Sequence, residues 1–64
     1  MEPNSLYDLM NQFVEESKSL WRVQGEYQEN AGDDAELKGY WGQMAADKAA
    51  RLAELKALIK ARLA

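Results

Sequence analysis

The residues with the clearest chemical potential are two cations inside an apolar segment. Lys48 and Arg51 stand three positions apart in the stretch AADKAARL, residues 45–52. Residues at this spacing lie on the same face of an α-helix, and the face that these two share is otherwise apolar. An ammonium and a guanidinium group placed together can pair with a carboxylate or bind an anion. The two side chains are therefore the first candidates for a site.

Three interpretations of the pair are open. Both side chains can lie along the apolar surface and bring their charges out at its edge, where Asp47 and Glu54 are partners for Arg51 on the same helix. Alternatively, Lys48 meets Glu16 of a facing helix, or of another subunit, in a partly buried ion pair that fixes register and partner choice. In the third interpretation the two cations bind an anionic ligand.

The sequence does not predict catalytic chemistry. It has no His and no Cys, which are the commonest bases and nucleophiles near neutral pH. Glu15 and Glu16 are adjacent carboxylates, but neighbouring helical residues point about 100° apart and do not converge on one site. We therefore predict that the chain is not an enzyme and that it has no catalytic residue, metal ligand or cofactor.

Charge and hydropathy argue against nucleic acid and membranes as partners. The chain has 8 basic and 11 acidic residues, a net charge of −3. The basic residues of the segment 48–64 oppose the dipole of a helix C-terminus and are spread around the helix, so they form no phosphate-binding face. No apolar run approaches the roughly 18 residues that cross a bilayer, and the opening MEPNSLYDL lacks the order of a signal peptide. We expect a cytoplasmic protein.

Two long helices must position these residues. The only Pro is at position 3, and strong helix formers dominate the second half of the chain. We predict a first helix over about 5–30, a turn over about 31–34 and a second helix over about 35–63. Gly32 is expected in the left-handed conformation, and Asp33 is expected to form a capping box with Glu36. The fold class is then all-α, an antiparallel two-helix hairpin in a single domain.

Each predicted helix carries an apolar stripe with steps of three and four residues. The first stripe contains Leu6, Met10, Phe13, Ser17, Leu20, Gln24 and Tyr27. The second contains Leu37, Tyr40, Trp41, Met44, Lys48, Leu52, Leu55, Leu58, Ile59 and Leu63. In an antiparallel hairpin residue i lies opposite about residue 65 minus i, which places Leu55 beside Met10 and Met44 beside Trp21.

A chain of this size needs more than its own core. It falls below the roughly 70–80 residues at which one core usually suffices, and it has no Cys for a disulfide. One hairpin leaves much of its stripe exposed, including Trp21 and Leu55. A second copy would complete a homodimeric four-helix bundle with two-fold symmetry. The predicted interface comprises Leu6, Met10, Phe13, Leu20, Trp21, Leu37, Trp41, Met44, Leu52, Leu55 and Ile59, with Glu16, Lys48 and Arg51 setting the register.

Two further possibilities concern the exposed stripe and the aromatic residues. The chain can be an adaptor whose stripe receives a helix of another protein. Separately, Trp21, Tyr27, Tyr40 and Trp41 fall at the turn end of the hairpin together with Met44. Such a group can line a ligand pocket, but aromatic and Met residues at helical spacing more often form a core or an interface.

The segments SLWRVQGEYQENA and YWGQMAADKAARLAEL together resemble half of a ferritin-like or rubrerythrin-like bundle. The resemblance implies a bundle related to the di-metal carboxylate proteins, in which a Glu of one helix faces a Glu-x-x-His of the next. In this sequence Lys48 and Arg51 occupy that i, i+3 slot, opposite Ser17 with Glu16 beside it. Two cations repel a metal ion, so the resemblance implies the fold without the di-metal site.

Overall fold

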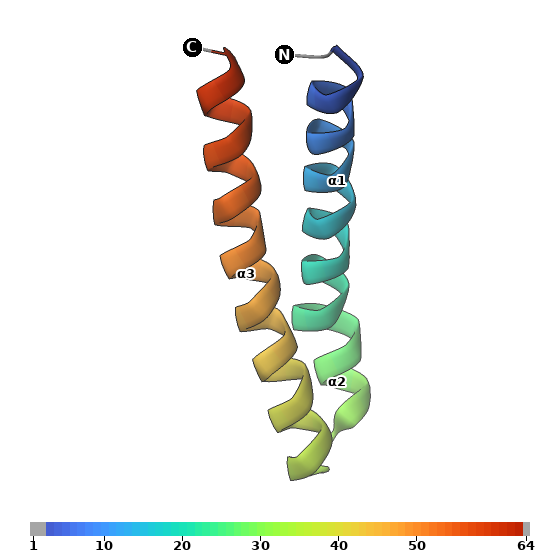
Figure 1. Ribbon diagram of the computed structural model, residues 1–64. Helices are drawn as coiled ribbons and strands as arrows, with labels where there is room; N and C mark the ends of the chain where they lie inside the picture. Colours follow the sequence, from blue (N-terminus) through green and yellow to red (C-terminus); the bar gives the residue numbers. More distant parts are fainter. Residues whose placement is uncertain (1–2, 64) are drawn as a thin grey trace.

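The chain folds back once on itself. In the computed structural model, which describes residues 3–63, two helical arms lie side by side and run antiparallel (Figure 1). The first arm consists of α1 (Pro3–Arg22), η1 (Val23–Tyr27) and α2 (Gln28–Ala31), and the second arm is α3 (Ala35–Leu63). The start of α1 and the end of α3 lie at the same end of the molecule. The described residues contain no strand, which confirms the all-α, two-helix prediction.

A tight turn joins the two arms. Gly32 has a φ of 57°, in the left-handed region that favours glycine. Asp34 caps α3, because its Oδ1 accepts a hydrogen bond from the backbone N–H of Leu37 at 3.1 Å. The predicted capping box between Asp33 and Glu36 is therefore wrong by one residue. Helical geometry begins directly after Asp34, and Leu37 is then the third helical residue, whose free N–H faces the cap.

A π-helical turn interrupts the first arm. In η1 the backbone N–H of Gln28 reaches the carbonyl oxygen of Val23, five residues back, so the turn accommodates one extra residue. After this insertion the adjacent residues Tyr27 and Gln28 are both half-buried. The side-chain Nε2 of Gln28 donates a hydrogen bond to the carbonyl oxygen of Lys38 at 3.1 Å, which ties the two arms together next to the turn.

The inner stripe of the first arm differs from the predicted one. Its least exposed side chains at steps of three and four residues are Leu6, Leu9, Phe13, Glu16, Leu20, Val23 and Tyr27. Met10 and Gln24, both predicted to face inwards, are exposed, and their neighbours Leu9 and Val23 take the inner positions. The prediction failed here because the adjacent pair Leu9 and Met10 fits either stripe, and because the predicted spacing places Ser17 in the stripe with Glu16 only beside it.

The inner stripe of α3 has the same spacing. It consists of Trp41, Ala45, Lys48, Leu52, Leu55 and Ile59. Leu55 is only 8% exposed, so the expectation that it stays open to solvent is wrong. It lines the same shallow depression as Leu9, which holds the inner position that had been predicted for Met10.

The predicted pairing of Met44 with Trp21 is also wrong. Met44 lies with Glu16 and Lys48 on one side of the hairpin. Trp21 lies with Ser17 and Lys18 and is 78% exposed. The inner stripe explains this result. Leu20 and Val23 face α3 in this part of the first arm, so Trp21 lies at the side of the hairpin.

One hairpin alone buries little apolar surface. Among the described residues, Val23 and Leu55 are the only buried apolar side chains. The molecule measures 47 × 15 × 12 Å and has a radius of gyration of 14.5 Å. A compact domain of this length has a radius of gyration of about 11 Å. The fold is therefore a thin rod with almost no interior of its own.

Candidate interaction surface

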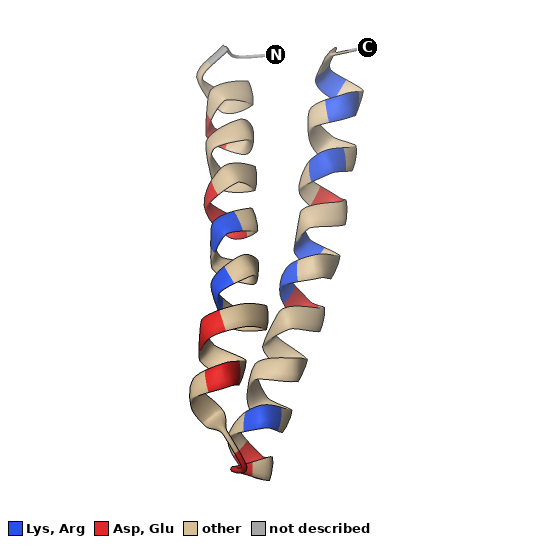
Figure 2. Cartoon of the chain, turned by 180° about the vertical axis from the view of Figure 1, so that it is seen from behind, with Lys and Arg blue, Asp and Glu red and all other residues tan. Residues whose placement is uncertain are grey.

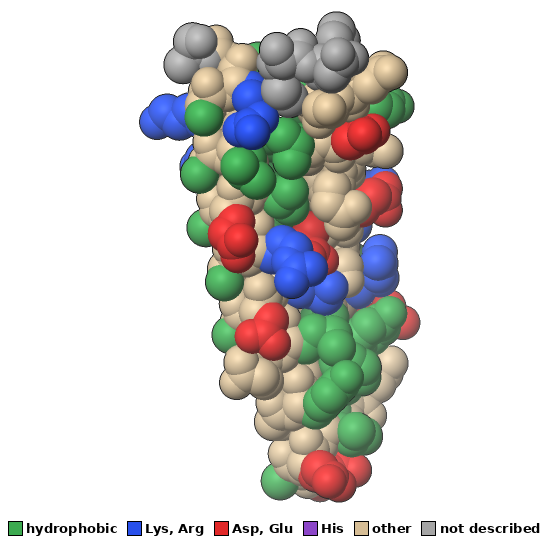
Figure 3. All heavy atoms as spheres, in the orientation of Figure 1, with side chains coloured by type: hydrophobic (Ala, Val, Ile, Leu, Met, Phe, Trp, Pro, Cys, Tyr) green, Lys and Arg blue, Asp and Glu red, His purple; other side chains and the backbone are tan. Residues whose placement is uncertain are grey.

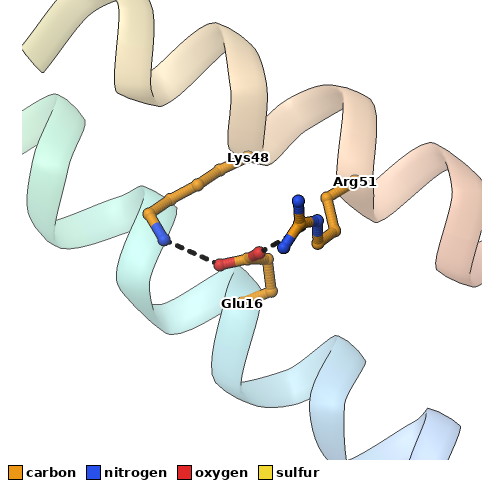
Figure 4. Close-up of polar contacts among 3 residues, drawn as sticks. All are labelled: Glu16, Lys48 and Arg51. Carbon is orange, nitrogen blue, oxygen red and sulfur yellow. Dashed lines mark hydrogen bonds and ion pairs between the residues drawn. The ribbon is translucent and has the colours of Figure 1, made fainter.

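The one cluster of charged side chains between the arms of the described chain joins Glu16 of α1 to two cations of α3. Lys48 Nζ lies 2.8 Å from Glu16 Oε1, and Arg51 Nε lies 4.0 Å from Glu16 Oε2. Figure 4 shows the carboxylate between the two basic side chains. The structure thus brings together all three residues that the sequence suggested, and it does so within one chain.

Burial differs sharply among the three side chains. Glu16 is the only buried charged residue of the described part, whereas the Arg51 side chain is 66% exposed and Lys48 lies between them. Glu16 and Lys48 occupy inner-stripe positions of their own helices, so α1 and α3 each contribute one charge to an otherwise largely apolar seam. No buried polar side-chain atom of the described residues lacks a hydrogen-bond partner. The Glu16–Lys48 contact therefore meets the requirement that a buried carboxylate be paired.

Arg51 behaves differently from Lys48. Neither Asp47 nor Glu54, its predicted partners along the helix, lies within ion-pair distance of it in the described structure; instead Asp47 Oδ1 accepts a hydrogen bond from Gln43 Nε2 at 2.9 Å. Charged side chains gather midway along the face that Figure 3 shows, with apolar side chains above and below them. Arg51 thus covers the edge of the seam, while Lys48 enters it.

A second apolar stripe runs along α1 beside the inner one. It follows the same steps of three and four residues through Tyr7, Met10, Val14, Ser17 and Trp21. Its four large side chains are between 40% and 78% exposed. A helix with two adjacent apolar stripes is typical of a bundle in which it packs against more than one neighbour.

The helix α3 contributes a row of mostly small residues next to this stripe. At the same spacing these residues are Gly42, Ala46, Ala49, Ala53, Lys56, Lys60 and Leu63. We call this row and the second stripe of α1 together the Met10 face. A groove of about 580 Å³ opens on it where α1 and α3 meet near the chain ends. The groove is lined by Met10, Phe13, Val14, Lys56, Ile59, Lys60 and Leu63.

The aromatic residues near the turn form a packed cluster without Trp21. The ring centroids of Tyr27 and Trp41 are 5.0 Å apart, and those of Tyr40 and Trp41 are 5.1 Å apart with the rings steeply inclined to each other. These distances are typical of stabilising aromatic pairs. The cluster joins the first arm to α3, whereas Trp21 belongs to the Met10 face.

Charge is unevenly distributed between the two ends of the rod. Basic residues gather toward the C-terminal end of α3, and acidic residues surround the turn at the opposite end (Figure 2). From residue 24 to residue 42 there are five acidic residues and one basic residue, a net charge of −4. The described part of the other end, residues 4–14 and 52–63, has three basic and two acidic residues, a net charge of +1.

The predicted interface residues fall into three groups in the structure. Leu55 is buried inside the hairpin, and Met10, Trp21 and Leu37 are exposed. The others are half-buried, namely Leu6, Phe13, Leu20, Trp41, Met44, Leu52 and Ile59. Val23, the most buried residue, and the exposed pair Tyr7 and Val14 were not predicted from sequence. A test for two parallel stripes on one helix would have found Tyr7 and Val14.

Two other properties of the described residues bear on chemistry. No three of their His, Cys, Asp or Glu side chains are grouped so that they could hold a metal ion. None of their helices is long and apolar enough to span a membrane. The slot that the ferritin-like resemblance assigns to metal ligands contains Lys48 and Arg51, which face Glu16.

Comparison with known proteins finds no family model that matches this chain, and no curated protein or solved structure that is significantly similar to it.

Proposed function

We propose that this chain is a non-enzymatic interaction protein that self-associates through the Met10 face into a homodimeric four-helix bundle. The observation that carries the proposal is the contrast between two buried apolar side chains, Val23 and Leu55, and five large exposed ones on the Met10 face, four from α1 and Leu63 from α3. Hydrophobic burial is the main favourable term in folding, and two side chains supply only a few kcal/mol. A partner on the Met10 face would supply the remainder.

The exposed area supports a partner of about the size of the chain itself. A compact protein of 7.3 kDa exposes about 4,200 Å². The hairpin exposes 4,873 Å², an excess of about 700 Å². One partner of a standard interface buries about 800 Å². The excess therefore corresponds to about one side of such an interface.

Within this proposal the Glu16–Lys48 pair selects how the two arms align. Sliding α3 by one heptad relative to α1 would move Lys48 about 10.5 Å along the rod. Glu16 would then face Trp41 or Leu55 and remain buried without its partner. Leaving a buried charge unpaired costs several kcal/mol. This cost disfavours the slipped alignment in addition to any loss of packing.

A charge placed on the Met10 face tests the proposal. In Val14→Glu the new carboxylate would be buried in the dimer, so we expect the dissociation constant to rise at least tenfold in sedimentation analysis. Gln12→Glu is the matched control, since Gln12 is exposed and lies about 160° from Val14 around α1, so the same added charge should change the constant little. Equal effects of the two variants would contradict the proposed interface.

The same measurement distinguishes the adaptor alternative. An adaptor would be monomeric at all concentrations, and its Met10 face would become ordered only with a helix of another protein. In that case Val14→Glu would leave the mass unchanged. The ferritin-like alternative stays a prediction, and stoichiometric iron or manganese on the purified protein would support it.

A further inference from the structure

The charge difference between the two ends of the rod bears on how two hairpins would meet. Two symmetric arrangements bring the Met10 face against its own copy. If the two-fold axis runs along the rod, both turns lie at the same end. If the axis crosses the rod, the turn of one hairpin lies beside the chain ends of the other. Both arrangements bury the same face, so apolar area alone does not choose between them.

From the charges we infer that the dimer is antiparallel, with the turn of each hairpin beside the chain ends of its partner. This inference rests on the proposed function. A parallel dimer would bring two turn ends together, each with a net charge of −4. An antiparallel dimer instead keeps the two acidic ends at opposite ends of the assembly, and the nearest charged end of the partner is its basic one, with Lys60 and Arg62. Juxtaposed like charges cost binding energy, and complementary charges fix orientation.

The antiparallel arrangement also determines which helices touch. A two-fold axis that crosses the rod packs α1 on α1 and α3 on α3. If Val14 lies at the axis, the spacing of the stripe puts Tyr7 beside the partner's Trp21 and Met10 beside the partner's Ser17. The first pair brings two aromatic rings together, and the second places a large side chain against a small one. Both kinds of pair pack well in an interface.

Size complementarity extends to α3. With Ala53 at the axis, the same spacing places Lys60 beside the partner's Ala46 and Lys56 beside the partner's Ala49. Leu63 then lies beside the partner's Gly42. A Cβ at Gly42 would meet only the amide nitrogen of Gln28, at 3.8 Å, so packing within the hairpin does not require glycine there. The long side chains of one α3 therefore lie over the small residues of the other, and the lysine methylenes can cover apolar surface while their charges reach solvent.

Distances between spin labels on single introduced cysteines test this orientation. The chain has no Cys, so each variant carries one label site. Ala35→Cys marks the turn end and Ala61→Cys the other end, and both alanines are exposed positions of α3. From a rise of 1.5 Å per residue, the antiparallel dimer predicts roughly 55 Å between the Ala35 labels and roughly 25 Å between the Ala61 labels.

The outcomes separate this inference from the proposed function. Two nearly equal short distances in a sample with the dimer mass would overturn the antiparallel orientation and leave the proposed homodimer intact. A monomer mass with no dipolar coupling for either label would refute both. One long and one short distance, as given above, supports the inference. Circular dichroism of each labelled protein checks that the helices are retained.

Discussion

For Lys48, the sequence identifies an unusual position but does not determine the role of the side chain. The heptad spacing identified it as a charge in an apolar stripe, and pairing with Glu16 was one of three interpretations of its role. The structure places the two atoms 2.8 Å apart. Sequence could not decide among these interpretations because the choice depends on which side of α1 faces α3, and the structure has Glu16 in the inner stripe where the predicted stripe has Ser17.

Replacing Lys48 by Met tests the role of the pair. The side chains are similar in volume, but Lys48→Met leaves the carboxylate of Glu16 buried without its partner. We expect a loss of about 1–3 kcal/mol in the free energy of unfolding, below the value for a fully buried pair because Lys48 is partly exposed. Urea unfolding at one fixed protein concentration measures it. A variant as stable as the parent would show that Lys48 only lies along the apolar surface.

The double variant Glu16→Leu with Lys48→Met is the control for that experiment. It removes both charges and keeps the seam filled, so most or all of the lost stability should return. In the double variant the alignment of α3 on α1 should also be less specific, because a slip of one heptad would no longer leave a buried charge without its partner. Failure of the double variant to recover stability would indicate that Lys48→Met disturbs packing and not the ion pair.

At the scale of the helices, much of the architecture was predictable. The turn at Gly32 and the two long helical arms follow from the composition of residues 30–34 and from the lack of any Pro after position 3. The π-helical turn at η1 was not predictable, because its sequence VQGEY has no distinctive pattern. The rotation of the inner stripe was missed for a related reason, since Leu9 and Met10 are both apolar and only tertiary packing chooses between them.

Glycines in α3 and in the turn should respond oppositely to substitution. Gly39 lies inside α3 on the exposed side, and a Cβ there would meet nothing within 4 Å. Gly39→Ala should raise the free energy of unfolding by up to about 1 kcal/mol, because alanine loses less backbone entropy in a helix. Thermal unfolding monitored by circular dichroism would detect the change. A destabilised Gly39→Ala variant would mean that this position is covered in the assembled protein.

Gly32→Ala is the comparison for Gly39→Ala. A Cβ at Gly32 also has open space, but its φ of 57° is one that an L side chain rarely adopts. The substitution should therefore lower the free energy of unfolding by about 1 kcal/mol. The opposite signs of the two effects would confirm that backbone conformation, and not contact, decides the requirement for glycine in this chain.

The whole molecule is a rod whose two ends differ in charge and whose Met10 face exposes large apolar side chains. Its 15 × 12 Å cross-section is little wider than two packed helices, which leaves no room for an enclosed core. From sequence we predict that the chain needs a partner, because a chain of this length has only a small core and, without Cys, no disulfide to reinforce it. The position of the Met10 face was not predictable, since it depends on which stripe of α1 the hairpin itself uses.

Light scattering coupled to size exclusion, over a hundredfold range of protein concentration, tests the central claim most directly. The homodimer has a mass of about 14.6 kDa, twice the 7.3 kDa of one chain. We expect the dimer mass at high concentration and, if dissociation falls within the range, a smooth decrease on dilution together with loss of helical signal. A constant mass of 7.3 kDa with full helix content and cooperative unfolding would contradict the account.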